Sequence, residues 1–241
     1  MRRPSLYTLH AMPSHPPSSA RRPRARLVLA SALLSGLLAG CGGSSGNGVA
    51  SKSTTEILAA SRAAVQSASS VHVSGQSAQG PLKLTINLRL ANSAGHAQVS
   101  VLGINFEVIR TGGTLYLKGG PAFYRQLGIT TNVPPGAWIK VANPGQAVGL
   151  TGYTELQSEV NRIATSANPP TKGAATTIDG EPVIELRTSG KLYSGRLYIA
   201  TTGQPYPLAL TKTGKETSDI TFSGWDQPVT ITAPTNTITI K

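Results

Sequence analysis

Apolar and polar side chains alternate without interruption over residues 82–90, which is the clearest pattern in the chain. Leu82, Leu84, Ile86, Leu88 and Leu90 are separated by Lys83, Thr85, Asn87 and Arg89. Because successive side chains of a β-strand point to opposite faces of a sheet, this spacing predicts a strand with one apolar face and one solvated face. Burial on one side only is typical of an antiparallel sheet.

Further segments with strand character follow at short intervals. We expect strands over 71–78, 95–102, 105–110, 114–118 and 138–141, and then over 174–178, 182–188, 192–200, 207–213, 219–224 and 229–233. Most of the connections are a few residues long and contain glycine or asparagine, as in Thr-Gly-Gly at 111–113 and Asp-Gly at 179–180. Connections of this kind join antiparallel neighbours, so the pattern predicts a meander.

Two segments change to a helical period. The sequence Ser-Thr-Thr-Glu at 53–56 matches a capping box, and the apolar stripe that follows ends near residue 67. A second helix is expected over 154–164, where Leu156, Val160 and Ile163 share one side, and a short helix over 121–127. The alternation of helix and strands predicts a single α+β domain over residues 54–241, with a large antiparallel sheet.

The predicted sheet is wide in relation to its helices. Eight or more strands have a broad apolar face, and two helices of about three turns each cover only part of it. Closure into a barrel, dimerisation, or enclosure of an apolar ligand between sheet and helices would each keep that face from water. In the last case, alternation and helical spacing give these lining residues: Leu82, Leu84, Ile86, Leu88, Leu90, Val99, Val101, Leu115, Leu117, Leu156, Val160, Ile163, Ile184, Leu186, Leu197 and Ile199.

The first forty residues differ from the rest in composition. Six arginines and no acid occur in residues 1–26, and residues 27–39 form an uncharged apolar run. Thirteen residues extend only about 20 Å as a helix, less than the roughly 30 Å hydrocarbon core, so residues 1–40 are expected to be an export signal and not a permanent span. Translation could begin at either Met1 or Met12.

The chain has a single cysteine, Cys41, directly after Leu-Ala-Gly at 38–40. These residues resemble the lipobox of bacterial lipoproteins, which implies that the Cys41 sulfur carries a diacylglyceryl group and that Cys41 becomes the first residue of the mature protein. The alternative is a secretory leader with an incidental cysteine. Each buried acyl methylene contributes about 0.8 kcal/mol, so two chains would hold the protein on the extracytoplasmic face of the cell membrane. Residues 41–53 are rich in glycine and serine and are expected to form a flexible tether.

The net charge depends largely on this leader. The chain has 22 basic and 10 acidic residues, but six of the arginines precede Cys41, which leaves 16 basic residues against ten acids after it. The remaining cations are scattered and form no ridge interleaved with aromatic residues, which argues against a nucleic-acid partner. A mildly basic surface suits anionic lipid headgroups.

Residues suited to catalysis are few. Only His72 and His96 follow Cys41, on separate predicted strands, and we expect His72 on the solvated side of an edge strand. The S-x-x-K and H-E-x-x-H motifs do not occur in the sequence, and Asp179 and Glu181 belong to an expected turn. Isolated histidines and scattered acids lack the spacing of metal ligands. The sequence therefore predicts no enzyme, no metal site and no cofactor.

Several segments together resemble the LppX/LprG group of actinobacterial cell-envelope lipoproteins. They are the lipobox, the Ser-Ser-Val-His at 69–72, and the stretches VSVLGINFEVIRTGGTLYLKG, GEPVIELRTSG, GRLYIATTGQPYPLAL and ITFSGWDQPVTITAP. The resemblance implies a large curved antiparallel sheet, a half-barrel of the LolA/LppX type, packed against a few short helices around a hydrophobic cavity. The sequence departs from the pattern at 197–200, where Leu-Tyr-Ile-Ala stands in place of the Trp-Ile-Asp found in many members.

The resemblance also implies a role. The protein would be a membrane-anchored lipoprotein that binds an acyl lipid or glycolipid and carries it within the cell envelope, with a transfer partner, such as an envelope transporter, that the sequence does not identify. The alternative is a non-catalytic interaction or structural lipoprotein whose interior is filled by its own side chains. Aliphatic inward residues suit acyl chains and a packed core equally well, so both hypotheses stay open at this point.

Overall fold

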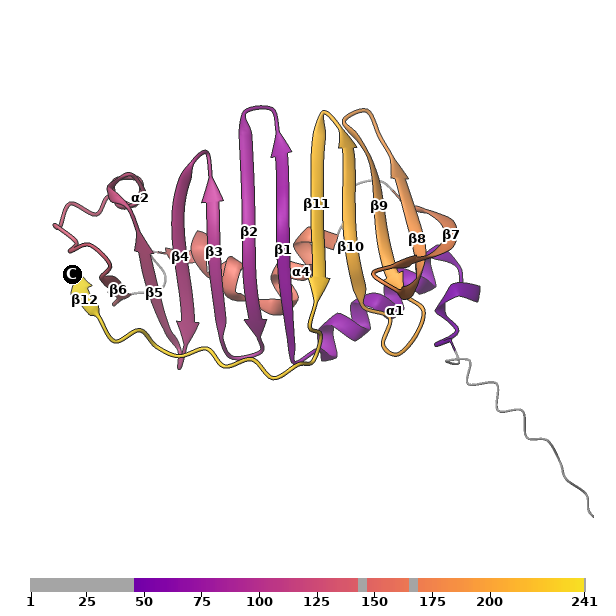
Figure 1. Ribbon diagram of the computed structural model, residues 1–241, viewed down its shortest axis with the longest axis horizontal. Coiled ribbons are helices and arrows are strands. Elements are labelled where there is room, and N and C mark those ends of the chain that lie inside the picture. Colours follow the sequence, from indigo (N-terminus) through magenta and orange to yellow (C-terminus); the bar gives the residue numbers. More distant parts are fainter. Residues whose placement is uncertain (1–45, 143–146, 165–168, 241) are drawn as a thin grey trace, which may run out of the picture. The chain divides into compact units, whose positions relative to one another are not determined.

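One twelve-stranded sheet organises the described residues of the computed structural model, which are 46–142, 147–164 and 169–240 (Figure 1). The strand order is β12-β6-β5-β4-β3-β2-β1-β11-β10-β9-β8-β7, and only β12 and β6 pair in parallel. The sheet is curved and does not close, since β12 and β7 are its two edges. Closure into a barrel, one of the three arrangements considered from the sequence, is therefore excluded.

The elements have the following bounds. The strands are β1 (Ser70–Gln79), β2 (Leu82–Ala91), β3 (Gly95–Val101), β4 (Ile104–Thr111), β5 (Thr114–Gly119), β6 (Trp138–Val141), β7 (Thr171–Ile178), β8 (Glu181–Ser189), β9 (Tyr193–Ala200), β10 (Pro207–Gly214), β11 (Glu216–Ser223) and β12 (Thr237–Ile240). The helices are η1 (Val49–Ser51), α1 (Thr54–Ser67), α2 (Pro121–Gln126), α3 (Val148–Thr151), η3 (Gly152–Thr154) and α4 (Leu156–Ala164). All but one of the strands expected from alternation are present, as are the three expected helices.

A local sequence signal accounts for the start of α1. The Ser53 Oγ accepts a hydrogen bond from the Glu56 N–H at 3.4 Å, and the Ser53 N–H donates to the Glu56 carboxylate at 2.9 Å. This reciprocal capping box satisfies backbone donors that a helix leaves free at its first turn. The capping box predicted from residues 53–56 is confirmed.

Alternation in β1 and β2 gives the sheet an apolar face and a polar face. The register pairs Val71 with Leu90 and Val73 with Leu88, and all four side chains are buried. The helices α1 and α4 lie behind the strands in Figure 1, and η3 contacts β2, β3 and β4, so the helical segments cover the apolar face. On the other face, the His72 Nε2 lies 2.8 Å from the Asn87 Oδ1.

Two expectations about strands were wrong. His72 is on the polar face, but its strand β1 lies at the centre of the sheet between β2 and β11, not at an edge. The segment 229–233 forms no strand, and the last strand is β12 at 237–240. The prolines at 228 and 234 remove backbone donors on either side of 229–233, which disfavours ladder pairing there.

The segment 224–236 instead runs along the ends of the strands that are lowermost in Figure 1, from β11 to β12, and we call it the strap. Its first residues are held at the start of β1, where the Asp226 N–H donates to the Ser70 carbonyl at 3.1 Å. The Thr111 hydroxyl donates to the Ile231 carbonyl at 3.3 Å, and the Trp138 N–H donates to the Asn236 carbonyl at 2.9 Å. The strap thereby brings β12 beside β6.

Residues 47–53 are packed on the folded unit, which differs from the flexible tether expected over 41–53. The Asn47 N–H donates to the Thr201 carbonyl at 2.7 Å, and the Asn47 side chain donates to the Ala200 carbonyl at 3.1 Å. Val49, in η1, is 2% exposed and belongs to the core. The buried Val49 side chain and the hydrogen bonds from Asn47 hold residues 47–53 on the folded unit. Composition alone had predicted a flexible linker for this segment. The leader and Cys41 lie outside the described residues.

Candidate binding pocket

An apolar pocket lies between the helices α1 and α4 and the strands β8, β9 and β10. It encloses about 740 Å³, counting the part that opens to solvent. Its apolar lining consists of Leu58, Val65, Val160, Ala164, Pro170, Leu186, Leu197, Pro207 and Leu210, and its polar lining of Ser61, Arg62, Asn161, Thr188, Tyr193, Gly195, Arg196 and Lys212.

Helical spacing and strand register explain how these residues meet. The α1 contribution comes from positions 58, 61, 62 and 65, a spacing that places side chains along one side of a helix. On the sheet, Leu186 of β8 pairs with Leu197 of β9, and Leu197 pairs with Leu210 of β10. Paired residues share a face, so these three leucines form one continuous apolar floor under the helices.

Cationic and aromatic groups lie at the polar end of the pocket. The Lys212 ammonium lies 4.4 Å from the centre of the Tyr193 ring, a cation–π contact, and Arg62 contributes from α1. The described lining contains no carboxylate, imidazole or thiol. The pocket can therefore hold an apolar chain with a polar or anionic end, but its lining offers no group of the usual acid–base or nucleophilic kind.

The structure distributes the sixteen residues that the sequence placed in a cavity over four environments. Val160, Leu186 and Leu197 line the pocket. Ten others lie in the packed core, namely Ile86, Leu88, Leu90, Val99, Leu115, Leu117, Leu156, Ile163, Ile184 and Ile199. Leu84 and Val101 are partly buried against that core, whereas Leu82 is exposed at the turn between β1 and β2.

Aromatic side chains fill the interior over β4 and β5. The Phe106 ring stacks on the Phe123 ring of α2 with centroids 4.7 Å apart, and it meets the Tyr153 ring of η3 edge-on at 6.1 Å. Alternation places Phe106 on the apolar face, but nothing in the sequence shows that Phe123 and Tyr153 pack on it from two separate helices. These rings fill this half of the interior in part, although Ile86, Val99 and Phe106 also border a second hollow.

Sequence reasoning also missed several pocket residues. Leu58 and Val65 belong to the α1 stripe, and Leu210 belongs to a predicted strand, so the patterns that could have identified them were present. Tyr193 and Lys212 gave no such signal, because each is an ordinary residue near a strand end. Only the pairing of β9 with β10 brings them together.

A second hollow of about 860 Å³, counting the part that opens to solvent, lies over β2–β5 and is lined by Ile86, Val99 and Phe106 as well as by Asn87, Gln98 and Glu107. Burial raises the pKa of the Glu107 carboxyl, but hydrogen bonds from Lys118 at 3.0 Å and from His96 at 3.0 Å lower it by more, and the net pKa lies below the ordinary value. A carboxylate held ionised in this way is unsuited to donating a proton at neutral pH.

No helix in the described ranges combines the length and the hydropathy needed to cross a membrane.

Comparison with known proteins places the fold. No protein-family model and no curated protein matches the sequence. Among solved structures, LprF from Mycobacterium bovis superimposes with a TM-score of 0.52 and 18% identity, over 75% of this chain and 96% of that one. The Mycobacterium tuberculosis lipoprotein LppX gives a TM-score of 0.43 and 13% identity, over 74% of this chain and 98% of that one. The α+β fold with a large curved antiparallel sheet, and the resemblance to the LppX/LprG group at the level of fold, are confirmed.

Proposed function

We propose that this protein is a membrane-anchored lipoprotein that binds an acyl lipid or glycolipid and carries it within the cell envelope. The observation that carries the proposal is the pocket itself, which has an aliphatic floor and cationic groups at one end. The fold shared with LprF and the lipobox-like residues before Cys41 support it. The proposed role is non-catalytic, in keeping with the lining.

Burial of apolar area supplies the binding energy in this proposal. An acyl methylene transferred from water to an apolar site contributes about 0.8 kcal/mol, so a buried stretch of eight methylenes would contribute about 6 kcal/mol before ordering costs. Leu186, Leu197 and Leu210 supply the surface. Lys212 and Arg62 also line the pocket, and a charge-assisted contact from either cation to a phosphate or another anionic headgroup would orient the lipid.

The anchor at Cys41 is a separate part of the proposal. A diacylglyceryl group on its sulfur would keep the folded unit at the extracytoplasmic face of the membrane. We expect a Cys41→Ser variant expressed in a bacterial host to move from the detergent phase to the aqueous phase on Triton X-114 partition. Retention of that variant in the detergent phase would contradict the anchor.

The filled half of the interior favours a second candidate, an envelope interaction module without a ligand. The stacked rings of Phe106 and Phe123 show that part of the apolar face is sealed by the protein's own side chains. On this hypothesis the pocket over β8–β10 is a packing irregularity, and the protein stays empty in the presence of lipid.

Lipid content separates the two candidates. Residues 43–241, which form one compact unit with its own core, can be purified without the anchor and examined by native mass spectrometry before and after incubation with dipalmitoylphosphatidylglycerol. We expect a lipid adduct for the wild type and its loss in Ala164→Trp, which fills the pocket from α4. Ala63→Trp is the matched control, because Ala63 is exposed on α1 and lies outside the pocket lining. A wild type that remains empty would favour the interaction module.

A further inference from the structure

The exposed large hydrophobic side chains of the described residues are all leucines, and three of them lie in β-hairpin turns. Leu102, between β3 and β4, is 60% exposed, Leu192, between β8 and β9, is 49% exposed, and Leu82, between β1 and β2, is 43% exposed. The fourth, Leu127, follows α2. Single exposed leucines are ordinary on a protein surface, so their common position is what matters here.

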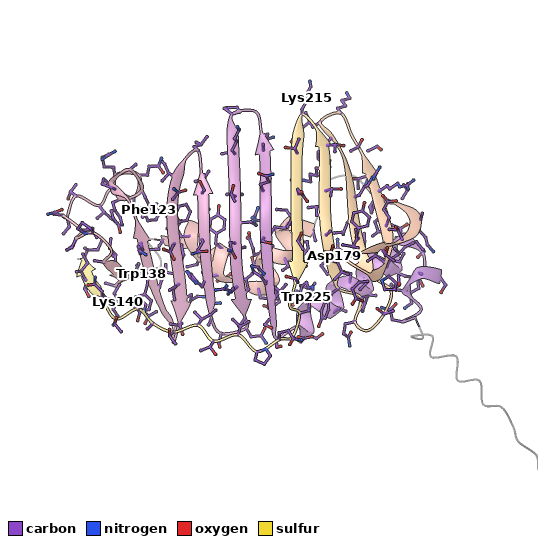
Figure 2. The ribbon with its side chains drawn as sticks, in the orientation of Figure 1. Phe123, Trp138, Lys140, Asp179, Lys215 and Trp225 are labelled. Atoms are coloured by element: carbon purple, nitrogen blue, oxygen red, sulfur yellow. The ribbon has the colours of Figure 1, made fainter. Side chains whose placement is uncertain are left out.

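The strand pairing places these turns at the same ends of the strands, and not along the edge strands β12 and β7. Because each of the strands β1–β5 and β7–β11 is antiparallel to its neighbours, the turns at 79–82, 101–104, 189–193 and 214–216 all lie at the same ends of the strands. We call this the tip edge; it is uppermost in Figure 1, and Figure 2 labels Lys215 on it. The connections at 91–95, 111–114, 178–181 and 200–207 lie at the opposite edge, where the described residues include no exposed large hydrophobic side chain.

Leu102 occupies a backbone conformation that leucine rarely adopts. Its φ is 51° and that of Gly103 is 80°, the pattern of a two-residue turn in which asparagine or aspartate followed by glycine is preferred. The turn at the opposite edge has nearly the same angles, 50° and 85°, and carries the preferred pair Asp179 and Gly180. Neither burial nor backbone preference explains a leucine at 102.

Lysines lie beside two of these leucines, and a third lysine lies in a neighbouring turn at the same end of the strands. Lys83 follows Leu82, Lys191 precedes Leu192, and Lys215 lies between β10 and β11. The nearby Glu216 carboxylate accepts a hydrogen bond from the Gln79 side chain at 2.9 Å. Leucines flanked by lysines, whose ammonium groups can reach phosphates while their stems lie along apolar chains, are suited to an anionic bilayer surface.

Two residues that line the pocket lie near this end of the strands. Lys212 lines the pocket and also lines a hollow of about 1,070 Å³ between the β1–β2 and β10–β11 hairpins. Tyr193, at the same end of the pocket, directly follows Leu192. A bilayer in contact with the tip edge would therefore lie next to these pocket residues.

We propose that the tip edge docks on an anionic phospholipid bilayer. Leu82, Leu102 and Leu192 insert below the headgroups, and Lys83, Lys191 and Lys215 contact the phosphates. The inference goes beyond the proposed lipid carrier, because it names the surface through which lipid enters and leaves. The chain joins the folded unit at the opposite ends of the strands, where Asn47 is bonded to residues 200–203. Residues 41–47 extend at most about 25 Å, less than the roughly 33 Å length of the ten-residue strand β1, so the tip edge docks on a bilayer other than the one that holds the Cys41 anchor.

Vesicle flotation of residues 43–241, which lack the anchor, tests the proposal. We expect binding to vesicles of phosphatidylcholine with 30 mol% phosphatidylglycerol and little binding to phosphatidylcholine alone. Leu102→Asn should weaken binding by about tenfold, as removal of one inserted leucine predicts. Its thermal stability should equal or exceed that of the wild type, because asparagine is preferred at this turn position. Asp179→Asn, which places the same residue in the matching turn at the opposite edge, should bind like the wild type.

A combined Lys83→Gln, Lys191→Gln, Lys215→Gln variant tests the electrostatic part. Each lysine near an anionic bilayer contributes about a fivefold gain in binding, so the loss should approach a hundredfold at low salt. The proposal is overturned if the wild type ignores anionic vesicles, or if both the Leu102→Asn and the triple lysine variants bind as it does. Native mass spectrometry of Leu102→Asn keeps this separate from the carrier hypothesis, because its retained lipid should match that of the wild type whatever its vesicle binding.

Discussion

Replacement of Asp226 by asparagine tests whether one carboxylate fastens the strap to the sheet. The Asp226 Oδ1 accepts hydrogen bonds from the Ser69 N–H at 2.8 Å and from the Ser69 hydroxyl at 3.0 Å. Its Oδ2 accepts from the Tyr206 hydroxyl at 2.6 Å, and the Tyr206 ring stacks on the Trp225 ring at 4.2 Å. One side chain thus joins the start of β1, the connection between β9 and β10, and the strap.

The size of the effect follows from what asparagine retains. Asp226 has a φ of 58°, which asparagine tolerates as well as aspartate does, so the backbone adds no penalty. The amide keeps one acceptor, but it loses the charge and presents an NH₂ group toward one of its present donors. A charge-assisted hydrogen bond contributes about 1.5–3 kcal/mol, and exposure of the site reduces the expected loss to about 1–2 kcal/mol. For a domain of this size that corresponds to a Tm lower by about 3–6 °C.

The pH dependence of this loss has a definite sign. Hydrogen bonds from Tyr206 and from the Ser69 N–H lower the pKa of Asp226, so its contribution to stability is full above the unfolded pKa of about 3.9 and is lost as the pH falls through the folded pKa. Burial and the Asp226 carboxylate raise the pKa of Tyr206 to about 12, so that contribution is full below about pH 10 and is lost as the pH rises through 12. The difference between wild type and variant should be greatest from about pH 5 to pH 9.

Thermal unfolding of residues 43–241, followed by circular dichroism from pH 3 to pH 9, measures this difference. Asp179→Asn is the control, because Asp179 also has a left-handed backbone, with a φ of 50°, and the structure gives its side chain no hydrogen bond. The control should change Tm by less than about 1 °C. An Asp226→Asn variant as stable as the wild type at pH 7, or a deficit of constant size down to pH 3, would refute the role assigned to the carboxylate.

Three further substitutions test the packing that supports the pocket. Gly95→Ala should destabilise the fold by about 1–3 kcal/mol in a denaturant titration, because the added Cβ would lie 2.4 Å from a backbone oxygen of η3. Gly149→Ala is the control and should be neutral, because its added Cβ would have no atom within 4 Å. Ser53→Ala removes the α1 cap and should cost about 1 kcal/mol in urea unfolding, with Ser51→Ala as an exposed comparison. Leu88→Ala opens a cavity in the filled core and should cost about 2–5 kcal/mol by calorimetry without loss of the lipid adduct; loss of the adduct would mean that the core and the pocket are one space.

Much of the fold was predictable because its signals are local. The alternation at 82–90 fixes which side chains of β2 face the core, since a shift of one residue would exchange the two faces. The capping box at 53–56 fixes the start of α1, and Asp-Gly at 179–180 fixes the turn between β7 and β8. Each of these signals acts through bonds between residues a few positions apart.

The pocket was only partly predictable, because alternation gives the face of a side chain and not what lies opposite it. Val160 and Ile163 share one side of α4, yet Val160 lines the pocket and Ile163 lies in the packed core. Likewise Leu186 and Leu90 both face inward from their strands, but only Leu186 borders open space. The difference depends on which elements lie opposite each side chain, and those elements are distant in sequence.

The sequence by itself determined most of the secondary structure, the inward face of each central strand and the absence of the S-x-x-K and H-E-x-x-H motifs, because these depend on residue type and short spacing. Tertiary structure decided that β1 pairs with β11, that the strap carries β12 to β6, and where the helices leave a gap over β8–β10. It also gathered leucines from three separate turns at one edge. These features depend on contacts between residues far apart in the chain, whose energies no local pattern records.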